Sequence, residues 1–181
     1  MSQQQRVYDE LLVLLAREGD RRAGERLAAR WRPRLLRTAR RLLRDADLAE
    51  DAVQEAWAGV WKGLRKLNDP SRFPAWAFGI LHRKCADRIR LAERLRARET
   101  ELDAAPTPAT RTDERALAIR QAFEQLDDTV RPTALLYYGE GLSVAEIALA
   151  TGVPAGTVKS RLFAARLKLK SLLKGDDDDE V

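Results

Sequence analysis

Apolar residues recur at intervals of three and four along nearly the whole chain, which predicts an all-α fold. A first leucine-rich helix ends at Gly19, and Asp20 is placed to cap a second helix. The apolar stripe of this second helix comprises Ala23, Leu27, Trp31, Leu35 and Leu42. Pro33 lies inside it and predicts a kink or a break, because proline has no backbone N–H to donate.

Two further helices complete the first half of the chain. Asp47 and Glu50 have the spacing of a capping box before a third helix. Its stripe comprises Val53, Ala56, Trp57, Val60, Trp61 and Leu64. A polar loop over 66–73 follows, and Pro74 opens a long fourth helix that runs to about Arg98. The stripe of that helix comprises Phe78, Leu81, Cys85, Ile89 and Ala92, so Cys85 is expected to be a small core residue.

The composition changes after the fourth helix. Residues 99–113 contain Pro and Thr without apolar periodicity, which predicts a flexible linker between two helical domains, at 1–98 and 114–175. In the second domain one helix carries Leu117, Ile119, Ala122, Phe123 and Leu126. Pro132 opens another helix through Tyr138, and residues 176–181 form an acidic tail.

The stretch 141–174 has the local signals of a helix-turn-helix. Ser143 and Glu146 form a capping box at the start of a short helix. That helix ends at Thr151 and Gly152, where glycine can adopt the positive φ of a tight turn. Pro154 suits the first turn of a second helix. Two short helices joined in this way are typical of DNA-binding proteins.

The second helix of this motif has two distinct faces. Its apolar face comprises Val158, Leu162, Ala165, Leu169 and Leu172, and the opposite face comprises Lys159, Ser160, Phe163, Ala164 and Lys170. Six basic residues and no acidic residue lie between Thr157 and Lys174. A cationic face of this kind suits a DNA major groove, whereas the alternative is a core helix with a solvated basic face.

Composition sets limits on the function. The chain has 181 residues and a net charge of +5, and its pI is near 9.6, which is compatible with a polyanionic partner. One Cys and one His exclude a disulfide framework and a Cys/His zinc site, and nothing indicates a cofactor. The sequence lacks paired carboxylates, a phosphate-binding Gly loop and a nucleophile constellation, so we expect that the protein is not an enzyme. The run 11–16 is too short to cross a membrane, and 1–6 is unlike a secretion signal, which predicts a soluble, cytoplasmic protein.

The first half of the chain carries a second set of candidate residues. Asp51 and Glu55 lie opposite the apolar stripe of the third helix, with Gln54 at its edge, and a merely solvated face is the simpler interpretation. Phe73 and Trp76 lie beside the polar loop, with cations nearby at Arg72, Arg83, Lys84, Arg88 and Arg90. Aromatic rings among cations suit an unstacked single strand, whereas the alternative is that both rings pack in the core.

Three strings in this order resemble bacterial sigma factors of the extracytoplasmic-function (ECF) group. They are DLAEDAVQEAWAGVW at 47–61, FPAWAFGILHRKCADRIR at 73–90 and GLSVAEIALATGVPAGTVKSRLFAAR at 141–166. The first two are similar to conserved region 2 and the third to region 4. The resemblance covers nearly all of the chain after the first few residues.

The resemblance implies roles for the candidate residues. Asp51, Gln54 and Glu55 would contact the β′ clamp helices of core RNA polymerase, and the β flap is a second implied contact. The −10 element would be bound by Asn68, Asp69, Ser71, Arg72, Phe73, Trp76, Arg83 and Lys84, around a base flipped out of the duplex. The −35 element would be bound by Thr157, Lys159, Ser160, Arg161, Phe163 and Arg166. An anti-sigma protein is usual in the family.

Two residues depart from the family pattern, and two other functions stay open. Arg83 stands where members often carry Asn, and Ala164 stands where an Arg often reaches DNA.

The tail at 176–180 is either solvated or folds back on the basic helix. The alternative functions are a helix-turn-helix regulator that binds duplex alone, with an N-terminal dimerisation or sensing domain, and a helical adaptor that binds a partner protein.

Overall fold

A computed structural model describes residues 3–96 and 114–174, and every regular element in these ranges is helical. The first range contains α1 (Gln3–Arg17), α2 (Arg21–Leu43), α3 (Ala46–Gly63), the short turns η1 (Leu64–Lys66) and η2 (Pro70–Arg72), and α4 (Phe73–Arg96). The second contains α5 (Glu114–Glu124), α6 (Arg131–Ala134), η3 (Leu135–Gly139), α7 (Val144–Thr151) and α8 (Ala155–Lys174). The predicted all-α fold is confirmed for these ranges, and the predicted linker at 99–113 and tail at 176–181 lie outside them.

The start of α3 differs from the sequence prediction. Asp45, and not Asp47, is the N-cap, because its carboxylate accepts the backbone N–H of Leu48 at 2.9 Å. Asp47 is already inside the first turn, and Glu50 bonds to Arg32 and Arg40, each at 3.1 Å. The capping box predicted at 47 and 50 is therefore wrong. The cap of α2 is as predicted, with Asp20 accepting the N–H of Ala23 at 3.0 Å.

Pro33 does not break α2, which continues through it from Arg21 to Leu43, so of the predicted kink or break the break is wrong. Proline in a helix interior costs about 3 kcal/mol or more, so other interactions have to hold the segment helical. Trp31 and Leu35 lie on either side of Pro33, and neither is exposed to solvent. Burial of these two side chains stabilises the helix across the proline.

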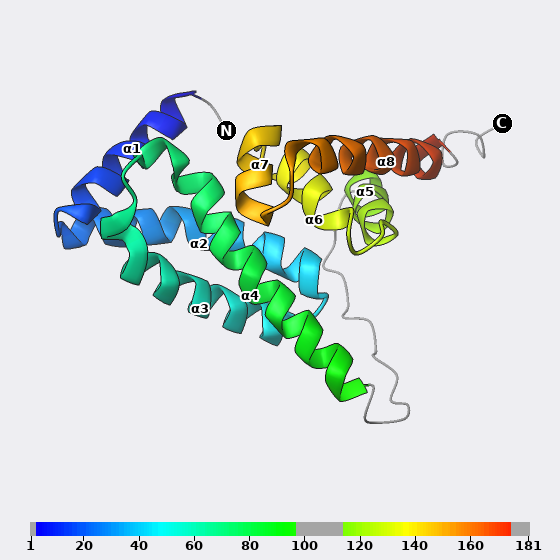
Figure 1. Cartoon of the computed structure of the whole chain (residues 1–181), viewed down its shortest axis with the longest axis horizontal. Helices are drawn as coiled ribbons and strands as arrows, with labels where there is room; N and C mark the ends of the chain where they lie inside the picture. Colours follow the sequence, from blue (N-terminus) through cyan, green and yellow to red (C-terminus); the bar gives the residue numbers. More distant parts are fainter. Residues whose placement is uncertain (1–2, 97–113, 175–181) are drawn as a thin grey trace.

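Helices α2, α3 and α4 form the core of the first half, and α1 packs against α2 (Figure 1). The predicted stripes supply this core, which includes Leu27, Trp31, Leu35, Val53, Ala56, Val60, Phe78, Leu81 and Cys85. Two stripe residues depart from the prediction, since Trp61 is 44% exposed and Ile89 is 36% exposed. Trp61 instead stacks on Trp57, with ring centroids 5.4 Å apart.

The helix-turn-helix has the local geometry that its sequence predicts. The Ser143 hydroxyl accepts the N–H of Glu146 at 3.2 Å, and the Glu146 carboxylate accepts the N–H of Ser143 at 2.7 Å. Gly152 ends α7 with φ at 73°. Val158, Ala165 and Leu169 of α8 are buried, as the stripe requires.

A smaller cluster connects α8 to α5 and α6, and consists of Ala122, Leu126, Val130, Ala134, Ala165 and Leu169. The helix expected from Pro132 to Tyr138 is present, although its second part is the π-helical turn η3. The buried Arg131 guanidinium holds this corner by donating to the carbonyl oxygens of Phe123, Glu124 and Leu126.

The two halves of the chain pack against each other. In Figure 1, α7 stands beside α4, and the two helices are in contact. A Cβ on Gly79 of α4 would lie 3.2 Å from the carbonyl oxygen of Ala150 in α7, which is closer than most side chains allow. The core of the first half also includes Leu136, Leu142, Ile147, Ala150 and Val158 from the second half.

Candidate nucleic-acid interface

The polar face of α8 is open to solvent. Lys159, Ser160 and Arg166 are exposed, and Phe163 is 65% exposed. Ser160 donates its hydroxyl hydrogen to the carbonyl oxygen of Thr157 at 3.0 Å, which leaves its lone pairs free to accept a further bond. The structure therefore brings these predicted −35 residues together on one accessible face.

Arg161 occupies a different position from the other −35 candidates. It is partly buried and lies close enough to His82 of α4 for its charge to affect the imidazole. Burial lowers the pKa of His82, and the positive charges of Arg161 and Arg83 lower it further. Arg161, a −35 candidate on α8, thus lies near His82 on α4. His82 is the sequence neighbour of Arg83, a −10 candidate.

The loop before α4 is held in shape by its own polar groups. The Asp69 carboxylate accepts the Ser71 N–H at 3.0 Å and the Ser71 hydroxyl at 2.6 Å, and it pairs with Arg72 at 3.2 Å. The hydroxyl bond of Ser71 is the main cause of a lowered pKa for Asp69. Asn68 is exposed at the start of this loop. All four loop candidates lie at the surface, and the Asp69 carboxylate connects three of them, Asp69, Ser71 and Arg72.

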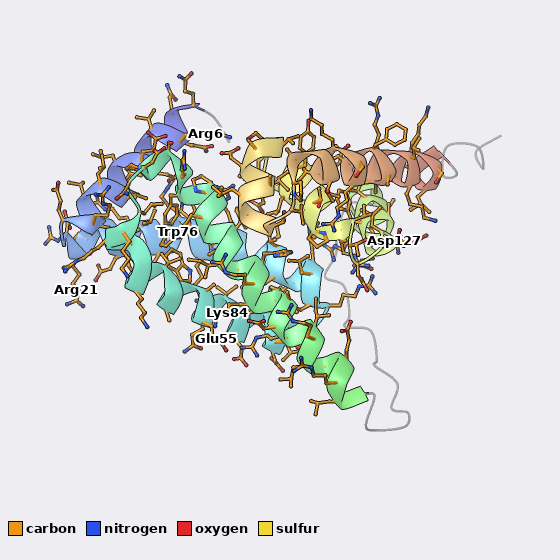
Figure 2. The ribbon with its side chains drawn as sticks, viewed as in Figure 1. Arg6, Arg21, Glu55, Trp76, Lys84 and Asp127 are labelled. Carbon is orange, nitrogen blue, oxygen red and sulfur yellow. The ribbon has the colours of Figure 1, made fainter. Side chains whose placement is uncertain are left out.

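The two aromatic candidates have different environments. Phe73 is 1% exposed and packs edge to face on Trp31. In this arrangement Phe73 is a core residue that supports the loop from beneath and has no face available to a base. Trp76 is half-buried, with its ring 6.1 Å from that of Phe73 and against Gly63. Figure 2 places Trp76 at the start of α4, next to the loop.

The acidic face of α3 lies against basic residues of α4. Figure 2 shows Glu55 beside Lys84, and their charged atoms are 2.9 Å apart. Arg88 lies 2.7 Å from Glu55 and 4.0 Å from Asp51, while Gln54 is exposed nearby. The hydrogen bond from Lys84 lowers the pKa of Glu55, and the charges of Lys84 and Arg88 contribute to the same shift. The predicted polymerase-binding and −10 surfaces therefore meet along the line between α3 and α4.

Sequence reasoning missed the ion pair between Glu140 and Arg34. The Glu140 carboxylate, at the end of η3, is 4% exposed and lies 2.9 Å from the Arg34 guanidinium of α2. The Thr38 hydroxyl donates to the same carboxylate at 3.0 Å. Nothing in the local sequence marks Glu140, because a glutamate between two glycines looks like an exposed turn residue.

The described residues contain neither a candidate metal site nor a candidate membrane-spanning helix. No three His, Cys, Asp or Glu side chains in 3–96 and 114–174 are grouped so that they could bind a metal ion. Within the same ranges, no helix has the length and apolar character needed to cross a bilayer.

Family models match both halves of the chain. Residues 27–95 match the model for sigma-70 region 2, and residues 116–169 match that for sigma-70 region 4. The chain is 32% identical over 155 residues to the ECF RNA polymerase sigma factor SigM of Mycobacterium tuberculosis, covering 86% of this chain and 79% of that protein. It is 28% identical over 182 residues to the RNA polymerase sigma-H factor of Pseudomonas aeruginosa, covering 92% and 94% of the two chains.

Solved structures with a similar fold include two complexes. CnrH, in complex with the cytosolic domain of CnrY, matches with a TM-score of 0.67 and 29% identity, over 93% of this chain and 99% of that one. The sigma factor RpoE of Bartonella quintana, in complex with the anti-sigma factor NepR, matches with a TM-score of 0.71 and 27% identity, over 83% and 96%.

A helical region 2 and a helix-turn-helix region 4 in one chain define a sigma-70-type transcription initiation factor. More narrowly, the chain belongs to the ECF family of RNA polymerase sigma factors. Its partners are accordingly core RNA polymerase and promoter DNA.

Proposed function

We propose that this sigma factor divides promoter recognition between two surfaces. α8 reads duplex DNA at the −35 element through Lys159, Ser160 and Phe163, with Thr157, Arg161 and Arg166 near the phosphates. The observation that carries this assignment is the exposure of that polar face while Val158 and Ala165, on the opposite side of the helix, are buried. A groove-binding helix needs this division.

The −10 element is bound at the loop and the start of α4. Asn68, Asp69, Ser71 and Arg72 present polar groups in a fixed loop, and Trp76, Arg83 and Lys84 lie beyond it on α4. Flipping a base out of the duplex costs a few kcal/mol of stacking and pairing, so a loop ordered in advance favours capture. Binding energy, and not nucleotide hydrolysis, then supports melting, and the chain itself catalyses no reaction.

Core polymerase is bound by the exposed acceptors of α3, which are Asp51, Gln54 and Glu55. They suit the basic surface of the β′ clamp helices, and region 4 is assigned to the β flap. We assign region 2 to 1–98 and region 4 to 114–175, with 99–113 as the connection. A protein that works on core polymerase acts in the cytoplasm.

The decisive experiment reconstitutes transcription. The purified chain is added to core RNA polymerase with a library of promoter fragments, and start sites are mapped. Specific initiation that depends on the added chain is expected. Binding of the chain to duplex DNA without polymerase, and with no gain in initiation, would instead indicate a stand-alone regulator. Neither activity would indicate an adaptor.

Regulation by an anti-sigma protein is proposed from the two solved relatives, which are complexes of CnrH with CnrY and of RpoE with the anti-sigma factor NepR. Such a partner would cover the open face of α8 or the acidic face of α3. Hydrogen exchange tests this idea, since an added anti-sigma protein should slow exchange at one of these faces. Protection elsewhere alone would contradict it.

A further inference from the structure

A charge pair with a buried carboxylate spans the contact between the two halves of the chain. We call this contact the seam, and define it by Gly79 and Ala150 together with Arg34, Thr38 and Glu140. The Glu140 carboxylate accepts from Arg34 Nε at 3.0 Å and from the Thr38 hydroxyl at 3.0 Å. Region 2 and region 4 are therefore joined by hydrogen bonds of defined geometry as well as by apolar packing.

The Arg34 side chain is fixed on the region 2 side of the seam. Its guanidinium carbon lies 4.3 Å from the centre of the Trp31 ring and 5.9 Å from that of Phe78. Both rings are core residues, so they hold the cation on the region 2 side of the contact. Glu140 is thus received by a prepared site, which gives the seam one preferred geometry.

The closed seam is incompatible with binding to both promoter elements at once, an argument that rests on the proposed function. The centres of the −35 and −10 elements are about 25 base pairs apart, or roughly 85 Å of B-DNA. Arg161, assigned to the −35 element, instead lies within electrostatic range of His82, the neighbour of Arg83. Arg83 is assigned to the −10 element. The two halves have to separate before both elements are occupied.

We propose that Glu140, held by Arg34 and Thr38, is a latch that keeps the free sigma factor closed and sets how readily it opens for polymerase and promoter. Opening returns both charges of the pair to water, and their hydration offsets much of the attraction that is lost. The pair therefore fixes the geometry of the contact and still allows it to open reversibly. If only a fraction of the molecules is in the open, binding-competent state, the apparent affinity for polymerase and promoter is reduced by that fraction. Weakening the latch should therefore increase the open fraction directly.

A thiol placed in the seam measures that fraction. Ala150 is 3% exposed in α7, so the thiol introduced by Ala150→Cys reacts with a reagent only when the seam opens. The native Cys85 thiol is 1% exposed in the core of region 2 and reports unfolding of that core. The ratio of the two labelling rates distinguishes opening from unfolding.

The test compares variants in the full chain carrying Ala150→Cys. Glu140→Gln removes the charge and keeps the shape, and about tenfold faster labelling of the seam thiol is expected, with Cys85 unchanged. Asp127→Asn is the matched control, because it removes the charge of an exposed carboxylate of region 4 and should have no effect. Thr38→Val removes only the hydroxyl, and a smaller increase is expected.

The outcomes separate the latch from the proposed function. The latch is overturned if neither Glu140→Gln nor Thr38→Val changes the seam labelling, or if both variants accelerate Cys85 in parallel with it. Adding core polymerase to the chain with the latch intact should also accelerate the seam thiol. If polymerase has no effect while Glu140→Gln does, the latch stands and the assignment of a polymerase-driven opening fails.

Discussion

The rings of Trp31 and Phe73 meet edge to face, with centroids 5.0 Å apart and planes at 87°. The contact joins the middle of α2 to the first residue of α4, directly beneath the loop assigned to the −10 element. It makes Phe73 part of the support of that loop, which is the core-packing alternative and not the contact with DNA that the family resemblance implies.

Substitution of Phe73 should therefore change stability before it changes recognition. Phe73→Ala should lower the free energy of unfolding by about 3–5 kcal/mol, the usual cost of emptying an aromatic core site. Phe73→Leu keeps most of the volume and should cost clearly less. Urea denaturation gives both values. If Phe73→Leu retains stability yet loses −10 recognition, the ring contacts a base after all.

On α8, loss of Lys159 or Phe163 should weaken −35 recognition while leaving core binding intact. Lys159→Ala and Phe163→Ala are each expected to reduce affinity for −35 DNA by roughly tenfold, the effect of losing about 1.4 kcal/mol of contact energy. Lys168→Ala is the control, because it removes one charge from an exposed position of the same helix. Equal loss of core binding in the first two variants would indicate misfolding and contradict the role.

On α3, Glu55→Ala and Gln54→Ala should weaken binding to core polymerase several-fold, as loss of a contributing contact does at a protein interface. Glu25→Ala is the control, since Glu25 is also an exposed helix glutamate paired with an arginine, Arg21, at 3.0 Å. Surface plasmon resonance with immobilised core enzyme measures these affinities. An equal effect of Glu25→Ala would show general charge attraction in place of a specific face.

His82 should make stability depend on pH. Its pKa is lowered in the folded chain by burial and by Arg161 and Arg83, whereas in the unfolded chain it is near the ordinary value of about 6.5. The unfolded state therefore binds more protons between these two values, and stability falls as the pH decreases through about 6.5. The melting temperature should drop more between pH 7.5 and 5.5 for the native chain than for His82→Gln. Parallel curves would contradict this.

The Cys85 thiol should be unreactive in the folded chain. Burial raises its pKa to about 12, and the side chain is 1% exposed, so both thiolate and access are lacking at neutral pH. Labelling with a thiol reagent at pH 8 should take hours natively and seconds in denaturant. Fast labelling of the native chain would place Cys85 outside the core.

Features set by neighbouring residues were predictable from the sequence. The Ser143 and Glu146 capping box and the Gly152 turn depend on a few positions each, and both are present as predicted. The buried stripes of α3 and α8 follow from helical period alone, apart from the exposed Trp61 of α3. The family resemblance, stated from three short strings, is likewise confirmed by the matches to regions 2 and 4.

Features set by distant residues were not predictable. Asp47 has a glutamate at the capping-box distance and Asp45 does not, yet Asp45 is the N-cap and the helix begins at Ala46. For Phe73 the sequence left both a nucleic-acid contact and core packing open, and only its position against Trp31 decides for the core. Glu140 finds Arg34 only after two segments 106 residues apart come together, and no periodicity encodes that meeting. Most of the candidate interface residues are now placed, while their contacts with DNA and polymerase stay predictions.

Leu136 and Leu142 of the second half lie in the same buried cluster as Leu35 and Phe78 of the first. Region 2 and region 4, which match two different family models, thus share one hydrophobic core in the free chain. Calorimetry on the intact protein should accordingly give a single heat-absorption peak, whose enthalpy cannot be apportioned to either region. A fragment containing one region alone would expose apolar side chains that are buried in the intact protein. The free energy of unfolding measured on such a fragment would therefore differ from the contribution of that region to the stability of the whole chain.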